Sequence, residues 1–233
     1  MIQATNSTDT GRTEAGSMVT SNDRPPVSNR FALTLLLTFL AVAAISGAQP
    51  ENRADWALEN VLTLLALPAL YWAHKKQWFS RRAYLMVFVF LLFHELGAHY
   101  TYSEVPYERW WHSLTGSSLS SALGWERNHY DRLIHLLFGI LLLIPIREIL
   151  QSTTRLSNAW SYAIAISIIT TASTIYELIE WGASVVFGGD LGMAYLGTQG
   201  DIWDAHKDMA LAMLGAVVTA GVLICIPRAK SKV

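Results

Sequence analysis

The sequence QGDIWDAHKD at 199–208 runs directly into the apolar stretch MALAMLGAVVTAGVLICIP at 209–227. The apolar stretch has no charged side chain and approaches the about 20 residues that a helix needs to cross a bilayer core. If the helix begins a little before 209, Asp201, Asp204 and Asp208 stand at i, i+3 and i+7 and share one face. Taken alone, such a stretch is most simply a solvated acidic loop, but similar acids recur elsewhere in the chain.

Five more apolar runs indicate the fold class. They cover 31–48, 56–73, 83–102, 133–150 and 159–181, in a chain of 233 residues that is 52% hydrophobic and 15% charged. Soluble domains have about 25% charged residues. Runs of this length favour membrane-spanning helices, and they exclude a β-barrel, whose strands are shorter. The sequence therefore predicts an all-α, polytopic transmembrane bundle of about six spans.

The basic residues predict the orientation of the bundle. Twelve of the 17 Lys and Arg residues fall in the two tails and in the second and fourth connections; the other five are Arg53, Arg109, Arg127, Arg132 and Lys207. Cytoplasmic segments carry the excess of Lys and Arg, so both termini are expected in the cytoplasm. Of the 18 acids, only Asp9, Glu14, Asp23 and Glu148 fall on that side. The other acids are thus expected at or near the periplasmic face.

The chain divides into a polar tail at 1–30, a transmembrane bundle at 31–227 and a short basic tail at 228–233. The first tail is rich in Ser, Thr, Asn and Asp, which predicts a disordered cytoplasmic segment. Ser46-Gly47-Ala48 resembles a signal-peptidase site, and cleavage there would leave five spans. The single Cys225 cannot form an internal disulfide. The sequence has no basic stripe or nucleic-acid motif, so nucleic acid is not an expected partner.

Acid and histidine pairs recur at four predicted helix ends, all on the expected periplasmic side. Each pair has a spacing that places both side chains on one face of its helix. Charged groups inside spans usually face the bundle interior or a water-filled cavity, so we expect the pairs to converge in one outward-facing pocket. Glu59 is a further candidate. The candidate ligand residues are Glu95, His99, Asp131, His135, Glu177, Glu180, Asp201, Asp204 and Asp208.

Three interpretations of this constellation remain open. Carboxylates and imidazoles suit a divalent metal such as Zn²⁺, Mn²⁺ or Fe²⁺, which would activate water while a spare acid acts as general base. Chains of carboxylates and histidines also suit a proton or cation pathway. The third interpretation is structural, because Arg132, Lys207 and the tyrosines could satisfy the acids without chemistry. The sequence contains no zinc-protease HExxH, since Ala98 stands where the second histidine would be, and no P-loop, GxSxG or Rossmann fingerprint.

Four blocks of sequence resemble the YjdF-like family of bacterial inner-membrane proteins. The blocks are FHELGAHYTY at 93–102, YDRLIH at 130–135, YELIEW at 176–181 and GTQGDIWDAHKDM at 197–209. The resemblance extends from the first span onward and implies a multi-pass protein of the bacterial inner membrane. It implies no substrate and no catalytic residue, because the family has no assigned function.

The sequence thus predicts an inner-membrane protein of unassigned function with an acidic and histidine-containing pocket at its periplasmic face. A metal-dependent membrane hydrolase is one function that fits, and a proton- or cation-coupled transporter is another. The expected partners are the lipid bilayer and a small molecule or lipid that the sequence does not identify.

Overall fold

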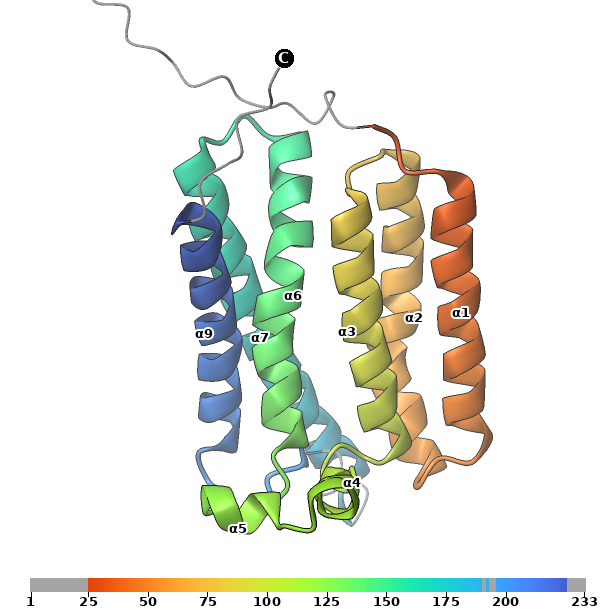
Figure 1. The fold of residues 1–233 in the computed structure, drawn as a ribbon, viewed down its shortest axis with the longest axis vertical. Helices are drawn as coiled ribbons and strands as arrows, with labels where there is room; N and C mark the ends of the chain where they lie inside the picture. The colour runs from red at the N-terminus through yellow and green to blue at the C-terminus, as the bar shows by residue number, and fades with distance from the viewer. Residues whose placement is uncertain (1–24, 190–191, 193–195, 226–233) are drawn as a thin grey trace, which may run out of the picture.

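The computed structural model describes residues 25–189, 192 and 196–225, and these contain helices but no strand. Six long helices stand side by side, and two short helices lie across one end of them (Figure 1). The long helices are α1 (Asn29–Ala48), α2 (Arg53–Lys75), α3 (Arg81–His99), α6 (Tyr130–Thr153), α7 (Asn158–Phe187) and α9 (Asp204–Cys225). The short ones are α4 (Tyr107–Thr115) and α5 (Leu119–Leu123).

Each of the six predicted runs coincides with one long helix, so the all-α prediction is confirmed. The largest difference is at the end of α7, which continues to Phe187 although the apolar run was expected to end at 181. Gly182 does not break the helix, whereas Gly188, with a φ of 59°, follows its last residue. Glycine is the residue that most readily takes this left-handed conformation, and it commonly ends helices for that reason.

Polar side chains cap the starts of four long helices. Ser28, Ser80 and Ser157 each accept a hydrogen bond from a backbone N–H in the first turn of α1, α3 and α7. Asn52 does the same for α2, accepting from two backbone N–H groups. These caps satisfy donors that the helix itself leaves unpaired, so the boundaries are encoded locally by Ser and Asn.

The closest helix contact joins α6 to α9. A Cβ added at Gly139 would collide with the backbone of Ala212 and Ala216, and one added at Gly215 would collide with the carbonyl of Leu136. Small residues at such positions let two backbones approach, which is how helices associate where lipid removes the hydrophobic driving force. This contact holds α9 against the helix that carries Asp131 and His135.

The bundle consists of two groups of three helices. Helices α6, α7 and α9 pack on one another, α1 and α2 pack with α3, and α3 packs against α6 to join the groups. The core of the first group includes Leu143 and Ile169, both fully buried. The core of the second group includes Phe79 and Tyr84, whose rings meet edge to face.

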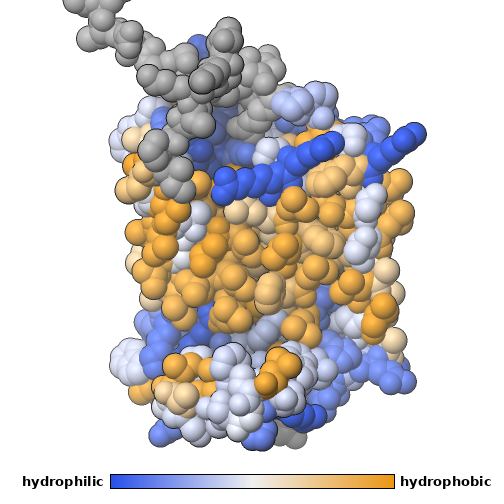
Figure 2. Space-filling model, viewed as in Figure 1, coloured by the Kyte–Doolittle hydropathy of each residue, from blue (hydrophilic) through white to orange (hydrophobic). Residues whose placement is uncertain are grey.

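Five described helices are long and apolar enough to cross a membrane: α1, α2, α6, α7 and α9. Helix α3 is not among these five, although it runs alongside α1 and α6 through the same layer (Figure 1). A broad hydrophobic belt surrounds the middle of the bundle on the face seen in Figure 2, with hydrophilic residues above and below it. The molecule therefore has the surface of a membrane protein.

The two ends of the bundle differ in charge. We call the end of the bundle where α2, α6 and α9 begin the acidic end, and we call the opposite end the basic end. Helices α4 and α5 lie across the acidic end (Figure 1). The predicted disordered tail at 1–30 lies mostly outside the described residues, and the basic tail at 228–233 lies wholly outside them.

Candidate functional site

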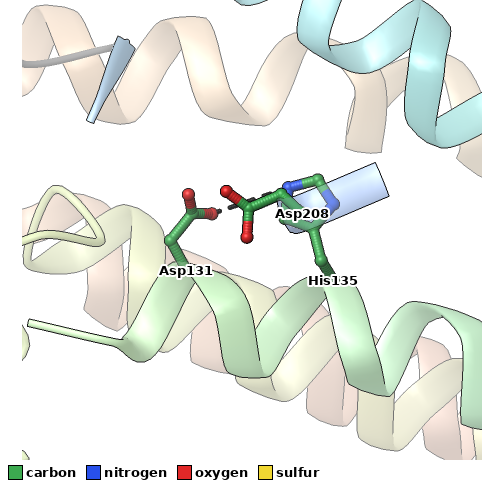
Figure 3. A group of neighbouring side chains, drawn as sticks. All are labelled: Asp131, His135 and Asp208. Carbon is green, nitrogen blue, oxygen red and sulfur yellow. Dashed lines mark ion pairs between the residues drawn. The ribbon is translucent and has the colours of Figure 1, made fainter. Parts of the chain in front are cut away.

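Three side chains meet at the acidic end of the bundle. Asp131 and His135 project from successive turns of α6, and Asp208 approaches them from α9 (Figure 3). Potential ligand atoms of the three residues all lie within 4.8 Å of one another. The pairing of Asp131 with His135 follows from their i, i+4 spacing, whereas Asp208 arrives through the close contact between α6 and α9. We call these three residues the Asp–His–Asp cluster.

Further groups surround His135. Its Nε2 lies 3.3 Å from Glu177 Oε1 and 3.7 Å from Asp131 Oδ1. Its Nδ1 lies 3.3 Å from the Ser173 hydroxyl on α7. Glu180, one turn beyond Glu177 and 5% exposed, adds a second carboxyl from α7 to the same neighbourhood. Helix α7 therefore supplies a second layer of acids around the cluster.

Asp208 is the most deeply buried acid of the cluster. Its side chain is 1% exposed, and its Oδ1 has no hydrogen-bond partner among the described residues. A buried carboxylate without partners is costly, since polar groups removed from water normally acquire a hydrogen bond or a counter-charge. With other carboxyls nearby, a cation or a proton is the natural compensation.

Asp201 and Asp204 have a different environment because basic side chains neutralise them. Arg127 and Arg132 both pair with Asp204 Oδ1, the second at 3.0 Å. Arg132 also pairs with Asp201, and Lys207 Nζ lies 2.6 Å from Asp201 Oδ2. These two acids belong to an ion-pair network with Arg127, Arg132 and Lys207.

The network also fixes the loop before α9. Arg127 donates to the carbonyl oxygens of Gly197 and Thr198 at 3.0 and 2.9 Å. The hydrogen bond from Lys207, with those from the Trp203 backbone N–H and from Arg132, holds the pKa of Asp201 well below its usual range. Arg127 and the loop residues thus position the start of α9, and with it Asp208.

Glu95 and His99 lie apart from the Asp–His–Asp cluster. The Nδ1 of His99 is 2.9 Å from the Ser46 carbonyl oxygen on α1. Glu95 is 1% exposed, and the Ser46 hydroxyl donates to its backbone carbonyl at 3.2 Å while receiving a hydrogen bond from Trp56. The His99 ring and the Glu95 backbone therefore contact Ser46 of α1, and the predicted role of both residues as metal ligands stays a prediction.

Two buried polar pairs beside the cluster were not singled out from the sequence as pairs. Tyr176 on α7 donates to Glu59 on α2 at 2.9 Å, and the ring of His94 on α3 bonds the hydroxyl of Tyr102. Glu59 is only a further candidate from the sequence, and His94 is not among the candidate ligand residues. No helical periodicity indicates these pairs, because each joins segments that pack only in the folded chain.

A cavity of about 700 Å³ adjoins the cluster. It lies between α2, α3, α6 and α7, and we call it the groove. Its polar lining includes His94, Tyr102, Asp131 and His135, whereas most of the remaining lining is apolar. The site thus combines potential metal ligands with an apolar chamber, which is the general composition of small-molecule sites.

The donor set defines what the cluster can hold. Two carboxylates and one imidazole suit Zn²⁺, Mn²⁺ or Fe²⁺ better than soft, thiolate-seeking ions. Three protein ligands would leave a coordination position for water, as catalytic metal sites do. The cluster therefore offers a donor set that could hold such an ion and leave one coordination position open.

The helical fold, the hydrophobic belt and the buried acids together define a polytopic membrane protein with a polar site near one end. Residues 31–229 match the family described as "Predicted membrane protein (DUF2238)", and the chain belongs to that family. It is 30% identical over 197 residues to "Inner membrane protein YjdF" of Escherichia coli (strain K12), covering 84% of this chain and 88% of that protein. The resemblance inferred from the four sequence blocks is thereby confirmed. No solved structure matches the chain.

Proposed function

We propose that this protein is a metal-dependent hydrolase of the bacterial inner membrane, with one divalent cation held by Asp131, His135 and Asp208. The observation that carries the proposal is the convergence of three ligand atoms within 4.8 Å of one another, with one Asp208 carboxylate oxygen buried and without a partner among residues 25–189, 192 and 196–225. A cation at this point compensates the carboxylates, which is the role that the buried environment leaves unfilled.

The neighbouring residues fit a hydrolytic role. If Nε2 of His135 faces the cation, its Nδ1 donates to Ser173, and this bond fixes the tautomer and the ring orientation. Glu177 lies 3.3 Å from His135 and is the acid best placed to take a proton from water. The cation would lower the pKa of a bound water, which makes hydrolysis feasible near neutral pH.

A proton or cation pathway is the competing function. The acids and histidine that line up from Glu59 to Asp208 favour it, because such chains relay protons in membrane pumps. The middle of the core between α6, α7 and α9 argues against a proton or cation pathway. Leu143, Ile169 and Ala216 are fully buried there, and they interpose an apolar layer between the cluster and the basic end. The groove beside this core is also lined mostly by apolar side chains beyond the cluster, so the arrangement fits a local polar site better than an ion path through the bundle.

We further propose that α3 is a sixth span, that both termini are cytoplasmic and that the acidic end faces the periplasm. Two observations support this. Helix α3 has 19 residues and runs beside α1 and α6, and α1 begins at the end where α9 finishes (Figure 1). The excess of basic residues at that end follows the positive-inside rule.

Metal titration of the purified protein tests the metal centre. We expect Zn²⁺, Mn²⁺ or Fe²⁺ to bind at about one ion per chain and to raise the unfolding temperature, because an ion that binds only the folded state stabilises it. Asp208→Asn should weaken binding by more than roughly 100-fold, since even outer-shell changes cost 10- to 100-fold. Asp201→Asn is the matched control, because Asp201 pairs with Lys207 and Arg132, and it should retain binding.

The readout is the metal-induced shift and not the stability of each variant alone, because Asp208→Asn also removes a buried charge. Equal metal binding by Asp208→Asn and by the unaltered protein would contradict the proposed centre.

Assays in detergent and in sealed vesicles separate the hydrolase function from the transporter function. A hydrolase acts without a gradient, whereas a transporter needs the sealed compartment.

A further inference from the structure

The groove follows the helix axes for much of the thickness of a bilayer. Its lining on α6 includes Asp131, Ile134, Phe138, Pro145 and Ile149, spaced three, four or seven residues apart. Residues at such spacing form one stripe along a helix, so the groove runs lengthwise and not across the bundle. From Asp131 to Ile149 the stripe extends about 27 Å, at roughly 1.5 Å per residue.

The side of the groove opens toward the membrane. Leu62 on α2 and Ile175 and Ile179 on α7 line it, yet their exposed fractions are 37%, 51% and 40%. All three side chains are apolar and belong to helices long and apolar enough to cross the membrane. A rim of this kind meets hydrocarbon and not water, so a molecule entering between α2 and α7 arrives from the bilayer.

The polar end of the groove lies at the depth in the membrane where the headgroup of a lipid is joined to its acyl chains. His135 stands five residues from the start of α6, or about 7–8 Å along the axis. The headgroup regions add about 5–7 Å to each side of the hydrocarbon core. The bond that joins a headgroup to an acyl chain lies at this boundary, and so does the Asp–His–Asp cluster when α6 begins at the membrane surface.

We propose that the substrate is a membrane lipid whose acyl chain occupies the groove and whose acyl ester lies at the Asp–His–Asp cluster. This inference rests on the proposed hydrolase function and names its substrate class. The water oxygen bonds to the carbonyl carbon while the bond from that carbon to the alkoxy oxygen breaks. One proton of the water passes through Glu177 to the departing alcohol, and the other remains with the released fatty acid.

A second cavity supplies an internal control. It measures about 520 Å³, lies between α1, α2 and α3, and is also mostly apolar. Its lining includes Ala32, Phe39 and His74 but no residue of the Asp–His–Asp cluster. Both cavities can accept annular lipid, but only the groove leads to the cluster. Lipid binding of catalytic relevance should therefore be confined to the groove.

Photo-crosslinking in lipid nanodiscs tests the proposal. The probe is a phosphatidylglycerol with a diazirine in the acyl chain, and labelled residues are mapped by mass spectrometry. We expect adducts concentrated at Ile134, Phe138 and Leu62. Ala66→Trp, which fills the groove from α2, should reduce them at least fivefold. Ala32→Trp, which makes the same change in the second cavity, should leave them unaltered.

The same nanodiscs, loaded with Zn²⁺ or Mn²⁺, are assayed for release of free fatty acid and for bound metal. The proposal is supported if the unaltered protein releases fatty acid and if Ala66→Trp lowers this release at least tenfold while the bound metal stays unchanged.

Other results contradict the proposal. Adducts spread evenly over lipid-facing positions such as Leu65 and Leu178, or adducts insensitive to Ala66→Trp, mean that only annular lipid is labelled, and they overturn the proposal. Labelling of the groove without bound metal overturns the hydrolase function while leaving the lipid site intact. Bound metal and a labelled groove without fatty-acid release overturn the ester substrate alone.

Discussion

The acids at the acidic end differ in whether their charge is compensated, because their immediate partners differ. Asp204 is 4% exposed and carries two arginines, whereas Asp208, four residues on and 1% exposed, has an oxygen without a partner in the part of the chain that the structure describes. Both side chains lie on one face of α9, so helical periodicity groups them. The positions of Arg127, in the connection before α6, and of Arg132, on α6 itself, separate a compensated carboxylate from one that can serve as a ligand.

The first residue-scale prediction concerns Arg127. Arg127→Ala removes a partner from a nearly buried carboxylate and frees the carbonyls of Gly197 and Thr198. Breaking a buried ion pair costs about 3–5 kcal/mol, and because Arg132 still contacts Asp204 we expect the free energy of unfolding to fall by an amount near the lower value. Chemical unfolding in detergent measures this free energy. Arg109→Ala, at an exposed position of α4, is the control and should change stability little.

A second residue-scale prediction concerns pH and Asp201. Its pKa is lowered in the folded protein, so its ion pairs stabilise the fold above the ordinary carboxyl pKa of about 3.9. This stabilisation is lost as the pH falls from there through the depressed folded pKa. The difference in unfolding temperature between the unaltered protein and Asp201→Asn should stay constant from pH 7 to about 5 and shrink below about 4. A difference that shrinks between pH 7 and 6 would show that Asp201 is not the titrating group.

At the scale of the helices, glycine decides where α6 and α9 meet. Gly215→Ala places a methyl group against the carbonyl of Leu136, and overpacking of this kind costs about 1–3 kcal/mol. We expect the variant to unfold at lower temperature and to lose metal-induced stabilisation, because Asp208 moves away from α6. Gly221→Ala is the matched control on the same helix. A Cβ there meets open space, and equal destabilisation by both variants would contradict the packing argument.

The helices themselves were predictable from sequence, since apolar runs and Ser or Asn caps are local signals. The pairing of Asp131 with His135 was predictable for the same reason. The third member of the cluster, Asp208, was not predictable. Its approach depends on the close packing of α6 and α9 at Gly139 and Gly215, and these helices are far apart in sequence. The hydrogen bonds from Ser46 to the Glu95 backbone and between Ser46 and the His99 ring likewise depend on the packing of α1, which no pattern within α3 indicates.

The charge asymmetry of the whole molecule predicts its orientation in the membrane. Reporter fusions at Lys76, at the basic end, and at Ser118, before α5 at the acidic end, test it. Six spans with cytoplasmic termini require a cytoplasmic signal from Lys76 and a periplasmic signal from Ser118. The same signal from both sites would show that α3 does not cross the membrane.

The contact between α6 and α9 also bears on how the protein is made. Asp131 and His135 leave the ribosome before Asp208, which emerges with α9. Until α9 is inserted, the carboxylate and imidazole on α6 lack their third neighbour, so the Asp–His–Asp cluster can form only after α9 has been made. A nascent chain that stops after α7 would have the correct membrane anchor and no complete cluster. Metal binding at the proposed centre would then begin only after α9 has packed against α6.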